Sequence, residues 1–162
     1  MIVNLDKSNI VVFRNGGHLA LNEKWCFGNE ELKVLNMYKY LGVYFTTRFT
    51  FSPALNDLAD RARKGMLAIM KLLWSIGEHS PDIFFKMFDC QMQPILTYGS
   101  EVWGLSDNQE SIERVHLSAL KRFLVSLQSP RCLIYGETGR HPPFCKHVCQ
   151  MYKVLPALDV YG

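Results

Sequence analysis

The sequence lacks any apolar run of about 18 residues, and Asp6 and Lys7 interrupt its N-terminal segment. A membrane-spanning helix and a secretory signal peptide therefore have no support. It also contains no Asp-Asp pair, P-loop, Gly-x-Gly-x-x-Gly string or recognisable Ser-His-Asp order, which removes the usual hydrolase and nucleotide-site interpretations. No internal repeat or low-complexity tract is present.

Charge and cysteine content are both modest. Of 162 residues, 48% are hydrophobic and 20% are charged, and the formal net charge is +3. This balance is compatible with a polyanionic partner but is too small to indicate one by itself. Five cysteines at irregular gaps predict free thiols in a reducing compartment. We expect a soluble intracellular protein, nuclear or cytoplasmic, with one average domain or two small ones.

Residues 1–50 have the pattern of short strands. A β-branched run at 10–13 is followed by Asn-Gly-Gly at 15–17, which is a turn signal. The Gly28-Asn29 pair separates two strand-like segments and predicts a tight hairpin. Residues 38–45, YKYLGVYF, alternate aromatic with small or polar side chains and predict one further strand.

Helical periodicity begins after this region, with a natural boundary at residues 47–53. Ser52-Pro53 is a good helix start, and apolar residues then recur every three or four positions until Gly77. Ser80-Pro81 repeats the start signal for a second helix that is apolar nearly all round. Pro94 should kink or shorten that helix.

The last part of the chain predicts two further helices. A Ser-x-x-Gln spacing at residues 106–109 fits the capping box of a helix that runs through Phe123. Residues 129–143 are typical of a loop. A final amphipathic segment at 144–155 should stop at Pro156.

Four stretches carry a common resemblance. They are NLDKSNIVVF at 4–13, YKYLGV at 38–43, PILTYGSEVWG at 94–104 and YGETGRHPP at 135–143. In this order they resemble the reverse transcriptases of LINE-type (non-LTR) retrotransposons: the segment after the catalytic Tyr-Ala-Asp-Asp turn, the "YLG" motif, the thumb signature and an E-x-G-R-x-P pattern. Each string alone is weak, but four in order over most of the chain are specific.

The resemblance implies a mixed α+β fold. Residues 1–50 would be the small antiparallel, β-rich end of a polymerase palm with a primer-grip-like hairpin. Residues 51–162 would be a helical thumb or connection region, truncated at the C-terminus. In this family the catalytic carboxylates that hold two Mg²⁺ ions lie upstream of the segment at residue 4. We therefore expect a fragment that binds no cofactor itself and does not polymerise DNA alone.

Candidate residues in the β-rich part take their roles from the resemblance. A lysine at the position of Lys7 is expected to protonate departing pyrophosphate in an intact parent enzyme, a role without meaning in this chain alone. Tyr40, Leu41 and Gly42 resemble the primer grip, where glycine lets the backbone approach nucleic acid. The alternative for these three residues is a bulge in a packed hairpin.

Arg61, Lys64 and Lys71 share one face of the first predicted helix, at steps of three and seven. Read with the resemblance, this stripe would contact phosphates of an RNA–DNA or DNA duplex without base specificity. An ordinary solvated face is the alternative, and Asp57 and Asp60 on the preceding turn dilute the positive charge.

Two other clusters suggest chemistry that we do not favour. Tyr98, Glu101 and Trp103 are expected to be structural, with Trp103 anchoring a turn between helices and Glu101 capping or pairing nearby. A zinc site is the second possibility, but its residues fit no CCHC knuckle spacing. Those residues are Cys132, His141, Cys145, His147 and Cys149.

The leading hypothesis is a duplex-gripping piece of a retrotransposon reverse transcriptase, without membrane or small-molecule partners. An alternative from another class is a non-enzymatic helical interaction module, or a decayed retroelement reading frame without selected function. Exposed apolar surface would favour this alternative, because strands that lose their sheet partners leave such surface uncovered.

Overall fold

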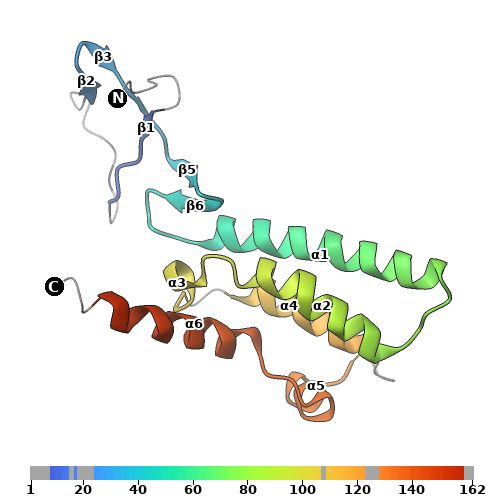
Figure 1. The fold of residues 1–162 in the computed structure, drawn as a ribbon. Helices are drawn as coiled ribbons and strands as arrows, with labels where there is room; N and C mark the ends of the chain where they lie inside the picture. The colour runs from blue at the N-terminus through green and yellow to red at the C-terminus, as the bar shows by residue number, and fades with distance from the viewer. Residues whose placement is uncertain (1–7, 15–16, 18–23, 107–108, 123–127, 159–162) are drawn as a thin grey trace. The chain divides into compact units, whose positions relative to one another are not determined.

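A computed structural model describes residues 8–14, 17, 24–106, 109–122 and 128–158 of the chain, with side chains as far as Val154. The protein combines short strands with a longer helical part, as a mixed α+β fold requires (Figure 1). Its internal contacts divide it into two compact units, Met1–Ala54 and Leu55–Gly162. Among the helices described, none is long and apolar enough to cross a membrane.

The first unit contains paired strands of minimal length. β2 (Cys26–Phe27) and β3 (Glu30–Glu31) pair antiparallel across Gly28-Asn29, so the predicted tight hairpin is confirmed. β1 (Asn9–Ile10) pairs with β4 (Lys33–Val34) in parallel, which corrects the expectation of a purely antiparallel part. A parallel pair needs a long connection, and the residues between β1 and β4 supply it.

β5 (Met37–Tyr40) and β6 (Val43–Thr46) form a second antiparallel hairpin. The prediction of one strand over residues 38–45 is therefore wrong. The register pairs the last residue of β5 with the first of β6, which leaves Leu41 and Gly42 as a two-residue loop. Both have positive φ, 46° and 86°, as a type I′ turn demands. Alternation continues on both sides of so short a turn, so periodicity alone does not reveal the reversal.

A chain of aromatic rings, of which Phe51 is buried and Phe13 and Phe49 are exposed, connects parts of the first unit. Phe13 contacts Phe49 edge to face at 5.4 Å between ring centroids, and Phe49 contacts Phe51 at 5.2 Å. Phe51 also meets Phe45 of β6 at 6.3 Å. Edge-to-face pairs add to the stabilisation that ring burial provides, so these contacts tie the hairpin to the segment that leads into the first helix.

The chain from Ser52 onward is helical. Its helices are α1 (Ser52–Ser75), α2 (Pro81–Leu96), α3 (Ser100–Trp103), α4 (Glu110–Lys121), α5 (Arg131–Thr138) and α6 (Pro143–Leu158). The long first helix that the periodicity predicts is confirmed, and its apolar residues at three- and four-residue steps are buried from Leu55 to Leu73, whereas Ile76, after its end, is exposed. The second helix is confirmed too, and it continues past Pro94.

The predicted start of the third helix at Ser106 is wrong, because α4 begins at Glu110. The side chain of Gln109 does not act in a capping box. Its amide nitrogen donates to the carbonyls of Gly104 and Ser106 at 2.5 and 3.3 Å, and its amide oxygen accepts from Nδ1 of His147 at 2.7 Å. These contacts come from the tertiary structure. The predicted end at Phe123 lies outside the described residues.

The predicted loop at 129–143 is also wrong, since it contains α5. Ile134 is the one residue of this helix that is fully buried, and it packs with Leu117 and Leu120 of α4. The helix ends where Gly139 adopts a φ of 61°. A single buried side chain per helix is too weak a periodic signal for sequence analysis to detect.

The final helix, α6, runs to Leu158, so the predicted stop at Pro156 is wrong. Proline removes one backbone donor and strains the preceding turn, which usually ends or kinks a helix. The remaining backbone bonds are sufficient to continue this one for the last residues described.

Replacing Leu41 by Asn should stabilise the β5–β6 hairpin. A non-glycine residue at left-handed φ loses roughly 1–2 kcal/mol, and Asn-Gly is the pair that suits a type I′ turn best. We expect slower amide hydrogen exchange along β5 and β6, equivalent to about 0.5–1 kcal/mol of local stability. Gly42→Ala, at a φ of 86°, is the matched control and should speed exchange. Equal exchange in L41N and the natural chain would contradict the turn assignment.

Candidate nucleic-acid interface

The hairpin tip of the first unit presents the YLG motif to solvent. Tyr40 is 59% exposed and Leu41 is 74% exposed. The β5–β6 register has no inserted residue, so the alternative of a bulge is wrong and the motif is a tight turn. Large side chains that point outward from a turn do not pack in the core. They are accessible to a partner surface.

Lys39 and Tyr44 lie directly opposite each other behind this turn. The Lys39 ammonium is 4.6 Å from the centre of the Tyr44 ring and donates to its hydroxyl at 3.4 Å. The pair adds a cation and an aromatic ring to the tip. Sequence reasoning missed both residues because their adjacency depends on the register, which the single-strand prediction did not contain.

The α1 stripe is present, but its charge is partly neutralised. Arg61 pairs with Asp57 at 3.2 Å. Lys64 and Lys71 are exposed on the side of α1 opposite its buried residues. They are seven residues apart, which is about 10 Å along a helix axis. An exposed ion pair contributes little, so Arg61 can exchange its carboxylate for a phosphate at small cost.

The candidate residues fall into two sets. Tyr40, Leu41 and Gly42 share one turn in the first unit, and Arg61, Lys64 and Lys71 share one helix in the second. Each set is a separate surface element. Lys7, expected to have a role only in an intact parent enzyme, lies outside the described residues.

The third motif, at residues 94–104, forms a buried corner. Trp103 is fully buried, and its indole nitrogen donates to the carbonyl of Tyr98 at 3.0 Å. Gly99 has a φ of 69°, and a side chain at Gly104 would collide with the carbonyl of Ser100. The expectation that Glu101 caps or pairs is wrong, because it is exposed and makes no such contact with the described residues.

The arginine of the fourth motif also has a structural position. Arg140 donates two hydrogen bonds to the carboxylate of Asp89 on α2, at 2.8 and 2.6 Å. Its guanidinium lies 4.5 Å from the centre of the Phe85 ring. Burial raises the pKa of Asp89, but the hydrogen bonds and charge of Arg140 outweigh it and hold that pKa below its usual range. The bidentate pair fixes the α5–α6 connection against α2.

Two histidines are buried in the second unit. His116 stacks against Tyr135 at 5.9 Å between ring centroids, and His147 meets Trp103 edge to face at 4.7 Å. Burial is the main cause that lowers the pKa of each to about 4. The charge of Arg140 lowers that of His116 further. Both rings are therefore neutral at pH 7, where they serve as packing groups.

The zinc candidates do not converge. His147 already donates from Nδ1 to Gln109, and the cysteines are exposed free thiols. Within the described ranges, no three His, Cys, Asp or Glu side chains are grouped closely enough to hold a metal ion. Tyr98, Glu101 and Trp103 are equally unsuited to joint chemistry, because the indole is buried and the other two side chains are exposed.

Comparisons with protein-family models, curated proteins and solved structures find no match to this chain. An account of its function therefore rests on the sequence motifs and on where the structure places aromatic and cationic side chains.

Protonation of the buried histidines should destabilise the second unit at acidic pH. Their pKa values of about 4 lie below the ordinary value near 6.5, so the unfolded chain binds these protons first. Above pH 6.5 the two histidines should not lower the free energy of unfolding. Between pH 6.5 and pH 4 that free energy should fall, by up to about 1.4 kcal/mol per pH unit for each histidine.

Urea denaturation across this pH window tests the assignment. His116→Phe keeps a ring between Phe88 and Tyr135 and removes one titrating group. The pH slope of stability should be shallower in this variant. Asp89 lies nearby, but its pKa is lowered, so it contributes mainly below this window. Parallel slopes for the variant and the natural chain would rule out His116 as a contributor.

Proposed function

We propose that this chain is the end of the palm and the thumb of a non-LTR retrotransposon reverse transcriptase, and that it holds a primer–template duplex. The observation that carries the proposal is the order of motifs at residues 4–13, 38–43, 94–104 and 135–143. No chance match of one string explains four in sequence. Catalysis belongs to carboxylates that the family places upstream of these motifs, with Mg²⁺ as their cofactor.

The placement of the YLG residues supports the first half of this proposal. A primer grip must bring a turn close to a nucleic-acid backbone, and a two-residue turn with Gly42 at its second position allows a close approach. Tyr40 and Leu41 offer apolar and aromatic contacts to sugars, and Lys39 offers a charge to phosphate. These contacts would be independent of base sequence.

The exposed face of α1 supports the second half. Lys64 and Lys71 are presented by a rigid element, and their separation of about 10 Å lets them reach different phosphates of one duplex. The aliphatic residues on the buried side of α1 hold the helix in place against the rest of the second unit. A stiff helix holds the cations on its outer face at fixed spacing, so that they can contact the regularly spaced phosphates of a duplex.

The alternative, a non-enzymatic interaction module, is favoured by a different observation. Several large apolar side chains in the second half of α1 and just after it are exposed: Leu67, Leu72, Trp74 and Ile76. Exposed side chains of this kind can contact a protein partner. Size-exclusion chromatography separates the two proposals. A clean monomer without nucleic-acid affinity would favour the self-contained module or a decayed reading frame, and aggregation would favour a truncated palm.

Removing both lysines should weaken duplex binding. For K64Q/K71Q we expect lower affinity for an RNA–DNA hybrid at low salt, and a salt dependence whose slope is smaller by about 1.8. Fluorescence anisotropy of a labelled hybrid measures both. The matched control is R63Q/K86Q, which removes two exposed cations, one of them already paired with Asp60. Binding that responds equally to both double variants would reflect net charge alone, and no binding by the natural chain would end the proposal.

Primer extension by this chain alone should be undetectable. The sequence contains no Asp-Asp pair to hold the two metal ions that nucleotide transfer requires. An assay with a primed RNA template, deoxynucleotides and Mg²⁺ gives the measurement, with an active reverse transcriptase as the positive control. Template-dependent extension by the purified chain would require a different catalytic site.

A further inference from the structure

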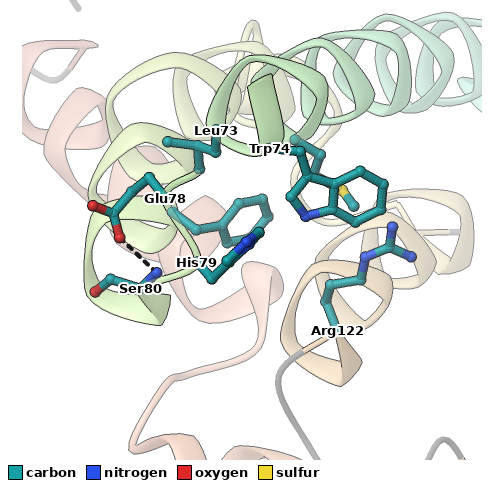
Figure 2. Close-up of a pocket in the computed structure, with 8 residues that line it drawn as sticks. Leu73, Trp74, Glu78, His79, Ser80 and Arg122 are labelled. Atoms are coloured by element: carbon teal, nitrogen blue, oxygen red, sulfur yellow. Dashed lines mark hydrogen bonds between the residues drawn. The ribbon is translucent and has the colours of Figure 1, made fainter. Parts of the chain in front are cut away.

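A hollow of about 130 Å³ opens where the end of α1 meets the start of α2 and the residue after α4. Its wall includes the rings of Trp74, His79 and Phe84, together with Glu78 and Arg122. Figure 2 shows Trp74 and Arg122 side by side at its edge. The hollow therefore combines flat aromatic surface with charges of both signs.

Trp74 and Arg122 form its most distinctive pair. The indole is 57% exposed, and the Arg122 guanidinium lies 5.3 Å from the centre of the indole ring. A large ring left in solvent and held by a flat cation is a platform onto which another flat group can stack. Trp103, by contrast, is fully buried and available to no ligand.

Arg122 also lines a second hollow of about 400 Å³. Its other cations are Arg114, Lys121 and Arg131. Arg114 pairs with Glu110 at 2.9 Å, and Arg131 pairs with Glu113 at 3.0 Å and with Glu110 at 3.5 Å. Within the described part of the chain, neither Lys121 nor Arg122 makes an ion pair with a carboxylate. A net positive hollow thus adjoins the aromatic one through a shared arginine.

The carboxylate of Glu78 distinguishes the two hollows. One of its oxygens accepts the backbone N–H of Ser80 at 2.8 Å, which holds the side chain at the rim of the aromatic hollow (Figure 2). A carboxylate repels phosphate but accepts a hydrogen bond from an amino group. The aromatic hollow therefore suits a neutral ring that carries an amino group, and the basic hollow suits an anion.

A nucleotide combines a flat base, which suits the aromatic hollow, with a phosphate, which suits the basic hollow. We infer that the two hollows bind single-stranded nucleic acid, with one base stacked on Trp74 and a flanking phosphate at Lys121 and Arg122. A base inside a duplex has its faces covered by its neighbours and does not offer one to an indole, whereas an unpaired base does. The inference extends the proposed nucleic-acid role to residues other than Lys64 and Lys71 and to a different form of the ligand.

Binding of two labelled ligands, a mixed-sequence single-stranded oligonucleotide and an RNA–DNA hybrid, tests this site. Trp74→Leu should weaken single-strand binding about tenfold, since stacking on one ring contributes on this scale. Trp74→Phe should keep most of the affinity. K121Q/R122Q should reduce the salt dependence for the single strand by about 0.7 in slope, the amount expected for one phosphate contact. R63Q/K86Q is the charge-matched control and should leave single-strand affinity within about twofold, as expected for cations outside the site.

Tryptophan emission gives a readout that a purely structural role would not change. A base stacked on Trp74 should quench part of the emission, and this quenching should disappear in W74F, while Trp25 and Trp103 still emit. Circular dichroism confirms that each variant keeps the helical content of the natural chain.

The outcomes separate this inference from the proposed function. Hybrid binding that depends on Lys64 and Lys71, together with single-strand affinity that is unchanged in W74L, would overturn the inference alone. Single-strand binding that quenches Trp74 emission, together with no binding of the hybrid, would overturn the duplex proposal alone. If K64Q/K71Q and W74L each weakened binding of both ligands to the same extent, both ligands would use the same residues, which contradicts a separate single-strand site.

Discussion

The burial of Trp103 is the constraint on which the second unit depends. Its indole is completely removed from solvent, and its N–H is satisfied by the carbonyl of Tyr98 at 3.0 Å. His147 of α6 packs against it, and Gln109 then links His147 to the carbonyls just before α4. A ring of this size contributes several kcal/mol through burial, and its one polar atom needs a hydrogen-bond partner when it is buried. The corner therefore fixes α3, the start of α4 and α6 together.

This constraint changes how the sequence motifs should be understood. The motif at residues 94–104 contains the buried Trp103 corner, and the motif at 135–143 contains Arg140, which pairs with Asp89. Their most distinctive residues are occupied by internal contacts and do not face a ligand. They specify the scaffold that holds α1 and α4 in position, and the exposed cations on those helices are what a polyanion would meet.

α1 connects the two proposed nucleic-acid surfaces. Lys71 and Trp74 are three residues apart, so they lie on neighbouring turns of the same helix. In the functions proposed above, a duplex along the lysines would lead toward a single strand at the indole, as at the junction where a template enters a paired region. The hairpin tip, with Tyr40 and Leu41, belongs to the other unit and contributes a contact of a different kind.

The sequence by itself determined the features that depend on neighbouring residues. The period of α1 and the Gly28-Asn29 turn follow from local rules, and the apolar character of Trp103 is consistent with its burial. Tertiary structure decided the rest. α5 exists because Ile134 is buried on α4, and Arg122 meets Trp74 only because distant helix ends come together. Local patterns report which face of an element is apolar, but they carry no information on which elements contact one another. The proposed stacking site is formed by residues from different helix ends, so local patterns could not predict it.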